Sequence, residues 1–303
     1  AFAAVGLTVG LIGVGYSSYT LHNEPSAQER TSLVGHMVVA DAGSTHTEFV
    51  LYRWESPCPV CNETAIYGTF ARQLPFVCDL KPGISSQTPE EVTQTVRLCL
   101  NEAAGNLSSE LVKDTPFRLR ATAGMRLLEH QNPTQSNQIL EAVRLGSVGT
   151  GFSNAGDAST NAILSGENEG AFSWAAANYL EGTLTDTYNA MHEGGMMAVR
   201  QLNTVGALDL GGASTQITFI PPDPRQIRDE DKGFLQLYNE SIEVYTHSYL
   251  CYGQLQMTNR RLAFLLNSSE SGDVVDPCFP AGYVSDPFTN ETLMDLLNNP
   301  CIE

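Results

Sequence analysis

The sequence has few basic residues and few aromatic ones. Lysine and arginine together number 16 against 34 aspartates and glutamates, which leaves a formal net charge of −18, and aromatic residues make up 8% of the chain. A chain this acidic repels nucleic-acid phosphate, so a general DNA- or RNA-binding surface is not expected. An anionic small molecule can still bind where backbone amides, a few cations or a metal ion oppose the negative field.

The composition of the chain also lacks the bias of a disordered tail or of a small disulfide knot. Of its 303 residues, 42% are hydrophobic, enough to fill the cores of two domains at about 150 residues each. No linker divides the chain cleanly, and residues 221–232 form a charged, proline-rich stretch.

No apolar run reaches the roughly 20 residues of a membrane-spanning helix. Residues 1–16 are mostly apolar or glycine, and the chain begins with Ala1 instead of methionine. We therefore interpret residues 1–19 as the trailing part of a transmembrane segment and residues 20–33 as a juxtamembrane linker. The apolar region of a signal peptide and a buried helix are the alternatives, although glycine disfavours a soluble helix.

No second cysteine pair and no histidine cluster accompany Cys58-Pro-Val-Cys61, so nothing completes a zinc site there. In an oxidising compartment most of the seven cysteines would pair. The odd number predicts a free thiol or a partner beyond Glu303, and we favour the second, a C-terminally truncated chain. Five glycosylation sequons support export: Asn62, Asn106, Asn239, Asn267 and Asn290.

Strand-like and helix-like segments alternate along the chain. Strands are expected at residues 37–40, 48–52, 117–121, 205–208 and 216–220. Helices are expected at residues 89–104, 137–145 and 170–180, the first with Thr88 as its N-cap and Pro89 at its first position.

A strand, turn and strand pattern occurs twice. Asp41-Ala-Gly-Ser-Thr-His-Thr47 is echoed by Asp209-Leu-Gly-Gly-Ala-Ser-Thr-Gln216, with apolar strands on both sides of each. In each copy a carboxylate ends a buried strand beside a glycine-rich turn, whose backbone N–H groups can converge on a phosphate. Ordinary turns favour the same residues and are the alternative. Two facing copies predict related lobes around a cleft, with the two aspartates holding a hydrated Mg²⁺ or Ca²⁺.

Hydrolysis of a phosphate also needs a group that deprotonates the attacking water. Glu169 is the candidate, because it stands beside Gly170 at an expected turn from strand to helix and can project into a cleft. The alternative is that Glu169 caps the helix and interacts with its dipole.

Taken together and in this order, four motifs resemble the conserved regions of the ecto-nucleoside triphosphate diphosphohydrolases, the ecto-apyrases. They are Asp41–Thr47, Ala121-Thr-Ala-Gly-Met-Arg126, residues 166–180 with Glu169 and Trp174, and Asp209–Gln216. The resemblance extends from about Val34 to Cys301, and residues 248–253 and 276–279 are similar to the cell-surface branch. It implies an α/β, two-lobed, actin-like or ribonuclease-H-like fold with its site between lobe I (34–165) and an incomplete lobe II (166–303).

The resemblance also implies roles residue by residue. Glu169 matches the catalytic base, Ser214 and Gln216 match the holders of the attacking water, and Thr122 lies near that water. Asp41 and Asp209 match the acids that bind Ca²⁺ or Mg²⁺ through waters. Arg126 is expected in a structural ion pair. The phosphate loops correspond to Gly43, Ser44, Thr45 and His46, with Thr45 where many relatives have serine, and to Gly211, Gly212 and Ala213.

In family terms Cys78 pairs with Cys99 and Cys251 with Cys301. The implied activity is extracellular, metal-dependent apyrase hydrolysis of nucleoside tri- and diphosphates by direct in-line attack of water, in a glycoprotein of the cell membrane that acts in purinergic signalling. A homo-oligomer is a further expectation. The alternatives are a non-catalytic nucleotide-binding ectodomain and an intracellular sugar kinase or exopolyphosphatase of the same superfold.

Overall fold

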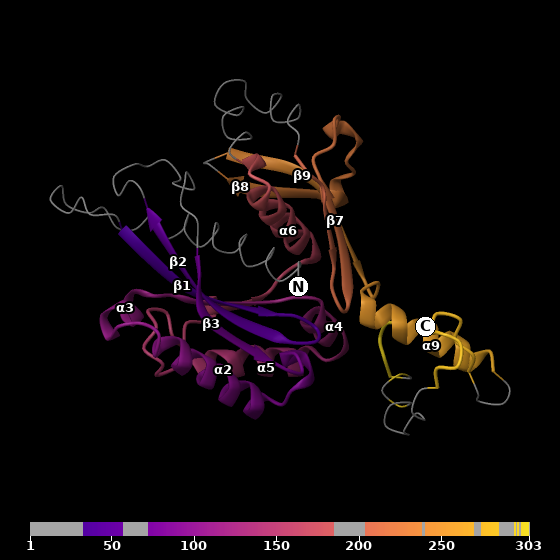
Figure 1. Ribbon diagram of the computed structural model, residues 1–303, viewed down its shortest axis with the longest axis horizontal. Helices are drawn as coiled ribbons and strands as arrows, with labels where there is room; N and C mark the ends of the chain where they lie inside the picture. Colours follow the sequence, from indigo (N-terminus) through magenta and orange to yellow (C-terminus); the bar gives the residue numbers. More distant parts are fainter. Residues whose placement is uncertain are drawn as a thin grey trace.

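The computed structural model describes residues 33–56, 72–184, 204–237, 240–269, 274–284, 294, 296 and 298–302. Two β-sheets form the framework, one from the first half of the chain and one from the second, and helix α6 (Gly166–Leu180) lies between them (Figure 1). The predicted membrane segment and linker, together with Cys58, Cys61, Asn62, Asn239 and Asn290, lie outside the described residues.

The first sheet has the strand order β3-β2-β1-β4-β5. β1 pairs antiparallel with β2 and parallel with β4, while β3 and β5 lie at the edges. The strands expected at residues 37–40 and 48–52 lie within β1 and β2, and the strand expected at residues 117–121 is β4. The bounds are β1 Leu33–Ala42, β2 Thr47–Ser56, β3 Arg72–Leu80, β4 Phe117–Ala121 and β5 Asn161–Ile163.

Helices α2 (Pro89–Ala104) and α5 (Pro133–Ser147) cover one face of this sheet (Figure 1). α2 begins and ends as predicted, because Thr88 and Glu91 form a reciprocal capping box. α5 begins four residues before the expected start, since the Asn132 side chain accepts from the Gln135 N–H and Pro133 occupies the first turn. The short helices α3 (Ser109–Asp114) and α4 (Ala123–Gln131) flank β4 in the chain.

The second sheet has the order β6-β7-β9-β8 and is antiparallel throughout. The strand expected at residues 205–208 is β6, which begins two residues later, and the strand expected at residues 216–220 is β7, which begins two residues earlier. The two strands pair with each other up to the turn that joins them, so each extends toward that turn. Single-turn 3₁₀ helices at Pro224–Gln226 and Asp229–Asp231 occupy the charged stretch. The strands are β6 Ala207–Leu210, β7 Ser214–Phe219, β8 Lys232–Leu237 and β9 Glu240–Leu250.

Helix α6 packs against both sheets. On one side Trp174 and Ala171 join the core of the second sheet, and on the other Phe172 packs against Met37 and Val39 of β1. A helix with two covered sides needs apolar residues all around, which explains its run of alanine, phenylalanine and tryptophan. β1 is also covered on both faces, and this explains why it is apolar along most of its length.

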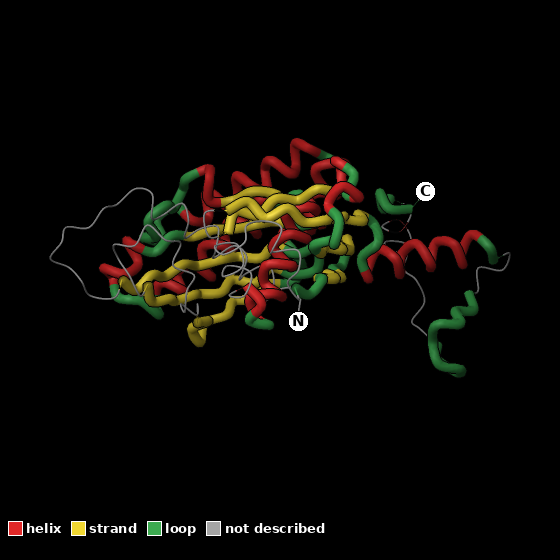
Figure 2. Tube along the Cα trace, turned by 90° about the horizontal axis from the view of Figure 1, so that it is seen from above, coloured by secondary structure: helices red, strands yellow, loops and turns green. Residues whose placement is uncertain are grey.

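Helix α9 (Gln254–Asn267) follows β9 and extends away from both sheets (Figures 1 and 2). Gln256 is the buried residue of this helix. No helix in the described part of the chain combines the length and apolar character needed to cross a membrane. The division of the chain at residues 165 and 166 stays a prediction, although the two sheets fall on either side of it.

Candidate active site

The two repeated motifs form hairpins with the same register. Asp41 pairs with Glu48 across the β1–β2 hairpin, and Asp209 pairs with Gln216 across the β6–β7 hairpin. Each aspartate is the next-to-last residue of its strand. The repeated sequence motif thus has a repeated backbone structure, in which the carboxylate occupies the same position relative to each turn.

The turns of the two hairpins lie against each other. A Cβ atom added to Gly212 would lie 2.4 Å from the Ser44 hydroxyl and 3.0 Å from the Thr45 methyl carbon. With Ser44 and Thr45 in these positions, a side chain at position 212 would require the Ser44 hydroxyl to move, and glycine avoids this. The residues predicted as two phosphate loops are therefore in contact, although more than 160 positions separate them in the sequence.

Helix α9 orients the second loop. The N–H groups of Gln254 and Leu255 donate to the carbonyls of Gly211 and Gly212 at 2.9 Å each. In a trans peptide the C=O and the following N–H point in opposite directions. The amides of Gly212 and Ala213 therefore point away from α9, the orientation that a loop binding a phosphate through its backbone requires.

Thr122 lies next to the first hairpin because β4 runs parallel to β1. Its backbone N–H donates to the carbonyl of Ala42, the last residue of β1, at 3.1 Å. The carboxyl ends of parallel strands meet at the same edge of a sheet, which is where ligand sites of α/β folds form. Helix α4 starts directly after Thr122 and carries Arg126 one turn later.

Glu169 lies inside α6 and not at the turn before it, so the prediction of its position was wrong. Ser165 is the N-cap, its hydroxyl accepting from the Asn168 N–H, and the helix begins four residues earlier than expected. Glu169 is therefore not the cap of this helix, although it is one of the two acidic residues in its first turn, where the helix dipole favours negative charge. The carboxylate is 8% exposed and accepts, through Oε2, from Arg126 Nη2 at 2.7 Å and from Gln216 Nε2 at 3.0 Å.

Burial raises the pKa of Glu169, and the charge and hydrogen bond of Arg126 oppose that shift. Arg126 is held in turn by a bond from Nη1 to the Leu164 carbonyl at 2.8 Å. The ion pair expected for Arg126 exists, and its partner is the candidate base itself. A carboxylate in this environment is a better proton acceptor than one at the surface.

Ser214 and Gln216 belong to β7, and their side chains lie beside Glu169 of α6. The Gln216 amide nitrogen is 2.7 Å from the Ser214 hydroxyl and 2.9 Å from the Ser248 hydroxyl, and Arg126 Nη2 is 2.9 Å from the same Ser214 oxygen. The other amide atom, Gln216 Oε1, is buried and has no hydrogen-bond partner. A buried acceptor without a donor is costly, so this atom needs a donor such as a water molecule.

Asp41 and Asp209 face a common negative region. Burial raises the pKa of Asp41 well above its ordinary value, and the charges of Glu169, Asp209 and Glu48 raise it further. Burial also raises the pKa of Asp209, while a 2.5 Å hydrogen bond from the Ser173 hydroxyl lowers it. The Asp209 charge thus acts on the Asp41 carboxyl, which makes these two side chains the candidates for a cation site.

The donor atoms at this position suit Ca²⁺ or Mg²⁺. Both aspartates offer hard carboxylate oxygens. Within the described residues no three aspartate, glutamate, histidine or cysteine side chains lie close enough to enclose a metal directly. A divalent ion here would complete its shell with water and with ligand phosphates, which is the usual coordination of Mg²⁺.

Three contacts of the site were missed by sequence reasoning. They are the bonds of Arg126 to Glu169, of Ser248 to Gln216 and of Ser173 to Asp209. The position of Ser173, four residues after Glu169 on an expected helix, was the available signal for the last. All three contacts join different elements, and for the other two no residue spacing gives even an indirect signal.

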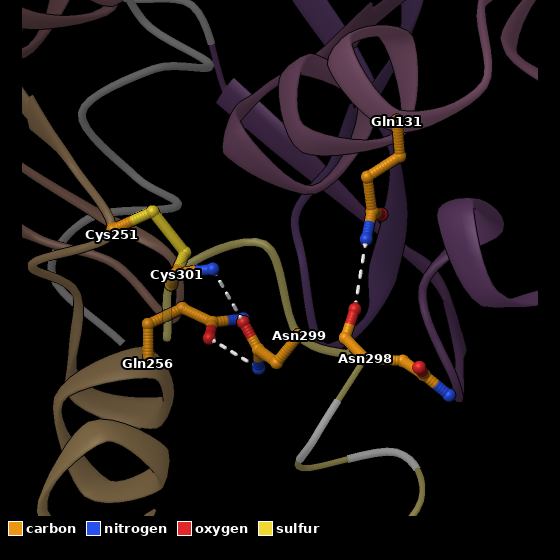
Figure 3. The surroundings of a disulfide bond; sticks show 6 residues. All are labelled: Gln131, Cys251, Gln256, Asn298, Asn299 and Cys301. Carbon is orange, nitrogen blue, oxygen red and sulfur yellow. Dashed lines mark hydrogen bonds between the residues drawn. A yellow bond between two sulfur atoms is a disulfide. The ribbon is translucent and has the colours of Figure 1, made fainter. Parts of the chain in front are cut away.

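Both predicted disulfides, Cys78–Cys99 and Cys251–Cys301, are present. The second lies beside the site, because Cys301 clusters with Ala123 of α4 and Ala213 of the second loop. Asn298 accepts from the Gln131 side chain at 3.3 Å (Figure 3). Cys278 is an exposed free thiol. Of the predicted glycosylation sites, Asn106 and Asn267 are exposed.

The two sheets, the duplicated hairpins and the buried carboxylates between them define an α/β protein of the two-lobed, actin-like class. A solved structure shares this fold: "Crystal structure of nucleoside triphosphate hydrolases from Neospora caninum" aligns with 85% of this chain and 51% of that chain, with a TM-score of 0.54 at 17% identity.

The chain belongs to the GDA1/CD39 (nucleoside phosphatase) family, whose profile matches residues 28–296. It is 37% identical over 271 residues to ectonucleoside triphosphate diphosphohydrolase 8 of Rattus norvegicus, covering 88% of this chain and 50% of that protein. It is 36% identical over 264 residues to ectonucleoside triphosphate diphosphohydrolase 3 of Homo sapiens, covering 86% and 47%. The chain thus spans about half the length of these relatives.

Proposed function

We propose that this protein hydrolyses nucleoside 5′-triphosphates and diphosphates to the monophosphate and phosphate. One observation carries the proposal: the Glu169 carboxylate accepts a hydrogen bond from Gln216, beside two touching glycine-rich loops. A base, a group that holds water and two anion-binding turns thus occupy one site. The names of the relatives, which are triphosphate diphosphohydrolases, support the same substrate class.

Glu169 acts as the general base. Its Oε2 is held by Arg126 and Gln216, and we assign Oε1 to the attacking water. The water loses its proton to Glu169 as its oxygen forms a bond with the terminal phosphorus, and the bridging oxygen leaves with the shortened nucleotide. No phosphoenzyme is required. Ser214 and the unpaired Gln216 Oε1 position that water.

The two loops bind the transferred phosphate. Ser44, Thr45 and His46 contribute from the first hairpin, and the backbone amides of Gly212 and Ala213 from the second. Asp41 and Asp209 would hold a divalent ion through its waters, and Thr122 lies at the same edge. The ion, when bound, neutralises charge on the phosphate oxygens.

The setting of this activity is part of the proposal. We place the enzyme at the cell membrane with its catalytic part outside the cell, in the cell-surface branch of the family. Its sequons are then glycosylated, and its role is the removal of extracellular nucleotides. Both disulfides fit an oxidising compartment.

The test is phosphate release from ATP, ADP and AMP by the full-length native protein, in calcium and again with a chelator. We expect release from ATP and ADP, none from AMP, and none after chelation. Nucleotide binding without release would favour a non-catalytic ectodomain. Transfer of the phosphate from ATP to an added sugar, with no free phosphate formed in the absence of sugar, would favour a kinase of the same superfold.

The E169Q variant tests the base. A missing general base slows turnover by about a hundred- to ten-thousand-fold, so kcat should fall by that amount while calcium-dependent nucleotide binding is kept. E167Q is the matched control, since Glu167 lies on the same helix and is only half-buried. Wild-type turnover in E169Q would remove Glu169 from the mechanism.

A further inference from the structure

Ser173 and Asp209 form a buried pair that the proposed reaction does not yet use. The Ser173 hydroxyl donates to Asp209 Oδ2 at 2.5 Å, and both residues are less than a tenth exposed. Ser173 comes from α6 and Asp209 from β6, so the bond joins the central helix to the second hairpin.

The bond selects one orientation of the Asp209 carboxylate. A carboxylate turns about χ2 over a broad range unless a partner holds one oxygen. The serine hydroxyl occupies Oδ2, which leaves Oδ1 for the region shared with Asp41, whose pKa is raised by the Asp209 charge. The orientation of Asp209 therefore depends on a residue of a different element.

The donor lies on the same helix as the candidate base. Ser173 follows Glu169 by four residues, so the two side chains lie on the same side of α6, one turn apart. The helix itself is fixed between the two sheets by Trp174 and Phe172. One rigid element thus holds both the base and the donor to Asp209.

We propose that Ser173 is a positioning residue, which orients Asp209 toward the water shell of the divalent ion. The inference rests on the proposed function, because it assigns Asp209 to that ion. Outer partners of this kind affect metal affinity more than they affect the fold. Ser173 itself touches neither the nucleotide nor the ion in this role.

Calcium binding separates this role from a structural one. Calcium is titrated calorimetrically into the full-length protein saturated with β,γ-imido-ATP, which cannot be hydrolysed at its terminal bond. We expect S173A to weaken calcium affinity by about 10- to 100-fold, the range found when a partner of a metal ligand is removed. S173T, which keeps the hydroxyl, should restore most of it.

A matched control is S136A. Ser136 is also a buried helical serine, but its hydroxyl has no hydrogen-bond partner, so its loss removes no bond. Calcium affinity should stay at the wild-type value in this variant. In a D209N background, S173A should cause no additional loss, because Ser173 acts through the Asp209 carboxylate.

The outcomes are distinguishable. A wild-type protein that binds no calcium–nucleotide and releases no phosphate would overturn the proposed function. If the wild type is active and S173A binds calcium as tightly as the wild type does, only the role of Ser173 is overturned. The same follows if S173A loses as much calcium affinity in the D209N background as it does in the wild type. If S173A does not fold, S173C takes its place, since the thiol keeps the volume and is a weaker donor; wild-type affinity in S173C would count against the proposal.

Discussion

Among single residues, Arg126 has the contact that most affects the chemistry. Its guanidinium lies 2.7 Å from the Glu169 carboxylate, and both side chains are nearly buried, at 12% and 10% exposure. Breaking a buried ion pair leaves an uncompensated charge. Arg126 thus determines how readily Glu169 is ionised, besides fixing where the carboxylate points.

Replacing Arg126 should change the pH dependence of the reaction. Glu169 accepts a proton only when ionised, so activity falls as the pH decreases through its pKa. Burial already raises that pKa and Arg126 lowers it, so R126A should raise it further and move the acidic limb of kcat/KM to higher pH. The measurement is the pH profile with ATP and calcium.

R126K serves as the control for this shift. It keeps the positive charge but loses the second guanidinium contact, to the Leu164 carbonyl. Its acidic limb should therefore lie between those of the wild type and R126A. An unchanged limb in R126A would mean that the titrating group is not Glu169.

Among the elements, the two hairpins determine whether the phosphate loops form one site. Their turns meet at Gly212 and Ser44, where a Cβ atom would fit only if the Ser44 hydroxyl moved. α9 supports the second turn from behind through bonds to the Gly211 and Gly212 carbonyls. The site therefore depends on the distance between two elements as much as on either one.

A methyl group at Gly212 should separate the loops. G212A would place a carbon 2.4 Å from the Ser44 hydroxyl and 3.0 Å from the Thr45 methyl carbon, so these side chains or the loop must shift, at a cost of up to about 1–3 kcal/mol. We expect a lower unfolding midpoint and a higher KM for ATP, and a partial recovery of stability when S44A is added. The measurements are thermal unfolding and steady-state kinetics.

G206A is the comparison for that experiment. A Cβ at Gly206 would lie 3.5 Å from its nearest neighbour, an ordinary contact, so both quantities should stay near the wild-type values. Equal behaviour of G212A and G206A would show that the loops do not approach each other as described.

In the whole molecule, the C-terminal described segment connects the two halves. Cys301 is joined to Cys251 after β9, Asn299 donates to Gln256 of α9 at 2.7 Å, and Asn298 accepts from Gln131 of α4 (Figure 3). The disulfide lies in a cluster with Leu127 and Ala213, so it packs against both sides of the site.

Removing this disulfide should affect both stability and nucleotide binding. In the double variant C251S/C301S we expect a loss of about 2–5 kcal/mol in the free energy of unfolding, together with weaker binding of calcium and β,γ-imido-ATP. C78S/C99S is the matched comparison, because that disulfide joins β3 to α2 within the core of the first sheet and makes no connection between the two halves. It should lose similar stability while keeping its nucleotide affinity, as measured by denaturant titration and calorimetry. Equal nucleotide affinity in both double variants would contradict the connecting role.

The sequence by itself determined the features that arise from interactions between residues close together in the chain. The Thr88 capping box defines where α2 begins, and the repeated Asp-x-Gly turns predict two hairpins of the same register. Through a family resemblance it also predicted the two disulfide pairs, which the structure contains, and the role of Glu169 as base, which stays a prediction. Those features follow from short-range hydrogen bonds, glycine in turns and motif order, all of which can be read along the chain.

The start of α6 at Gly166 also has a local cause, the Ser165 cap, which sequence reasoning missed. Only the tertiary structure decided what Glu169 contacts, because packing between two sheets brought Arg126, Gln216 and the carboxylate together from three elements. The same packing put Gly212 against Ser44 and Ser173 against Asp209. Such contacts depend on the distances between packed elements. Those distances are set by the packing of the whole core, so they cannot be read from the spacing of residues along the chain.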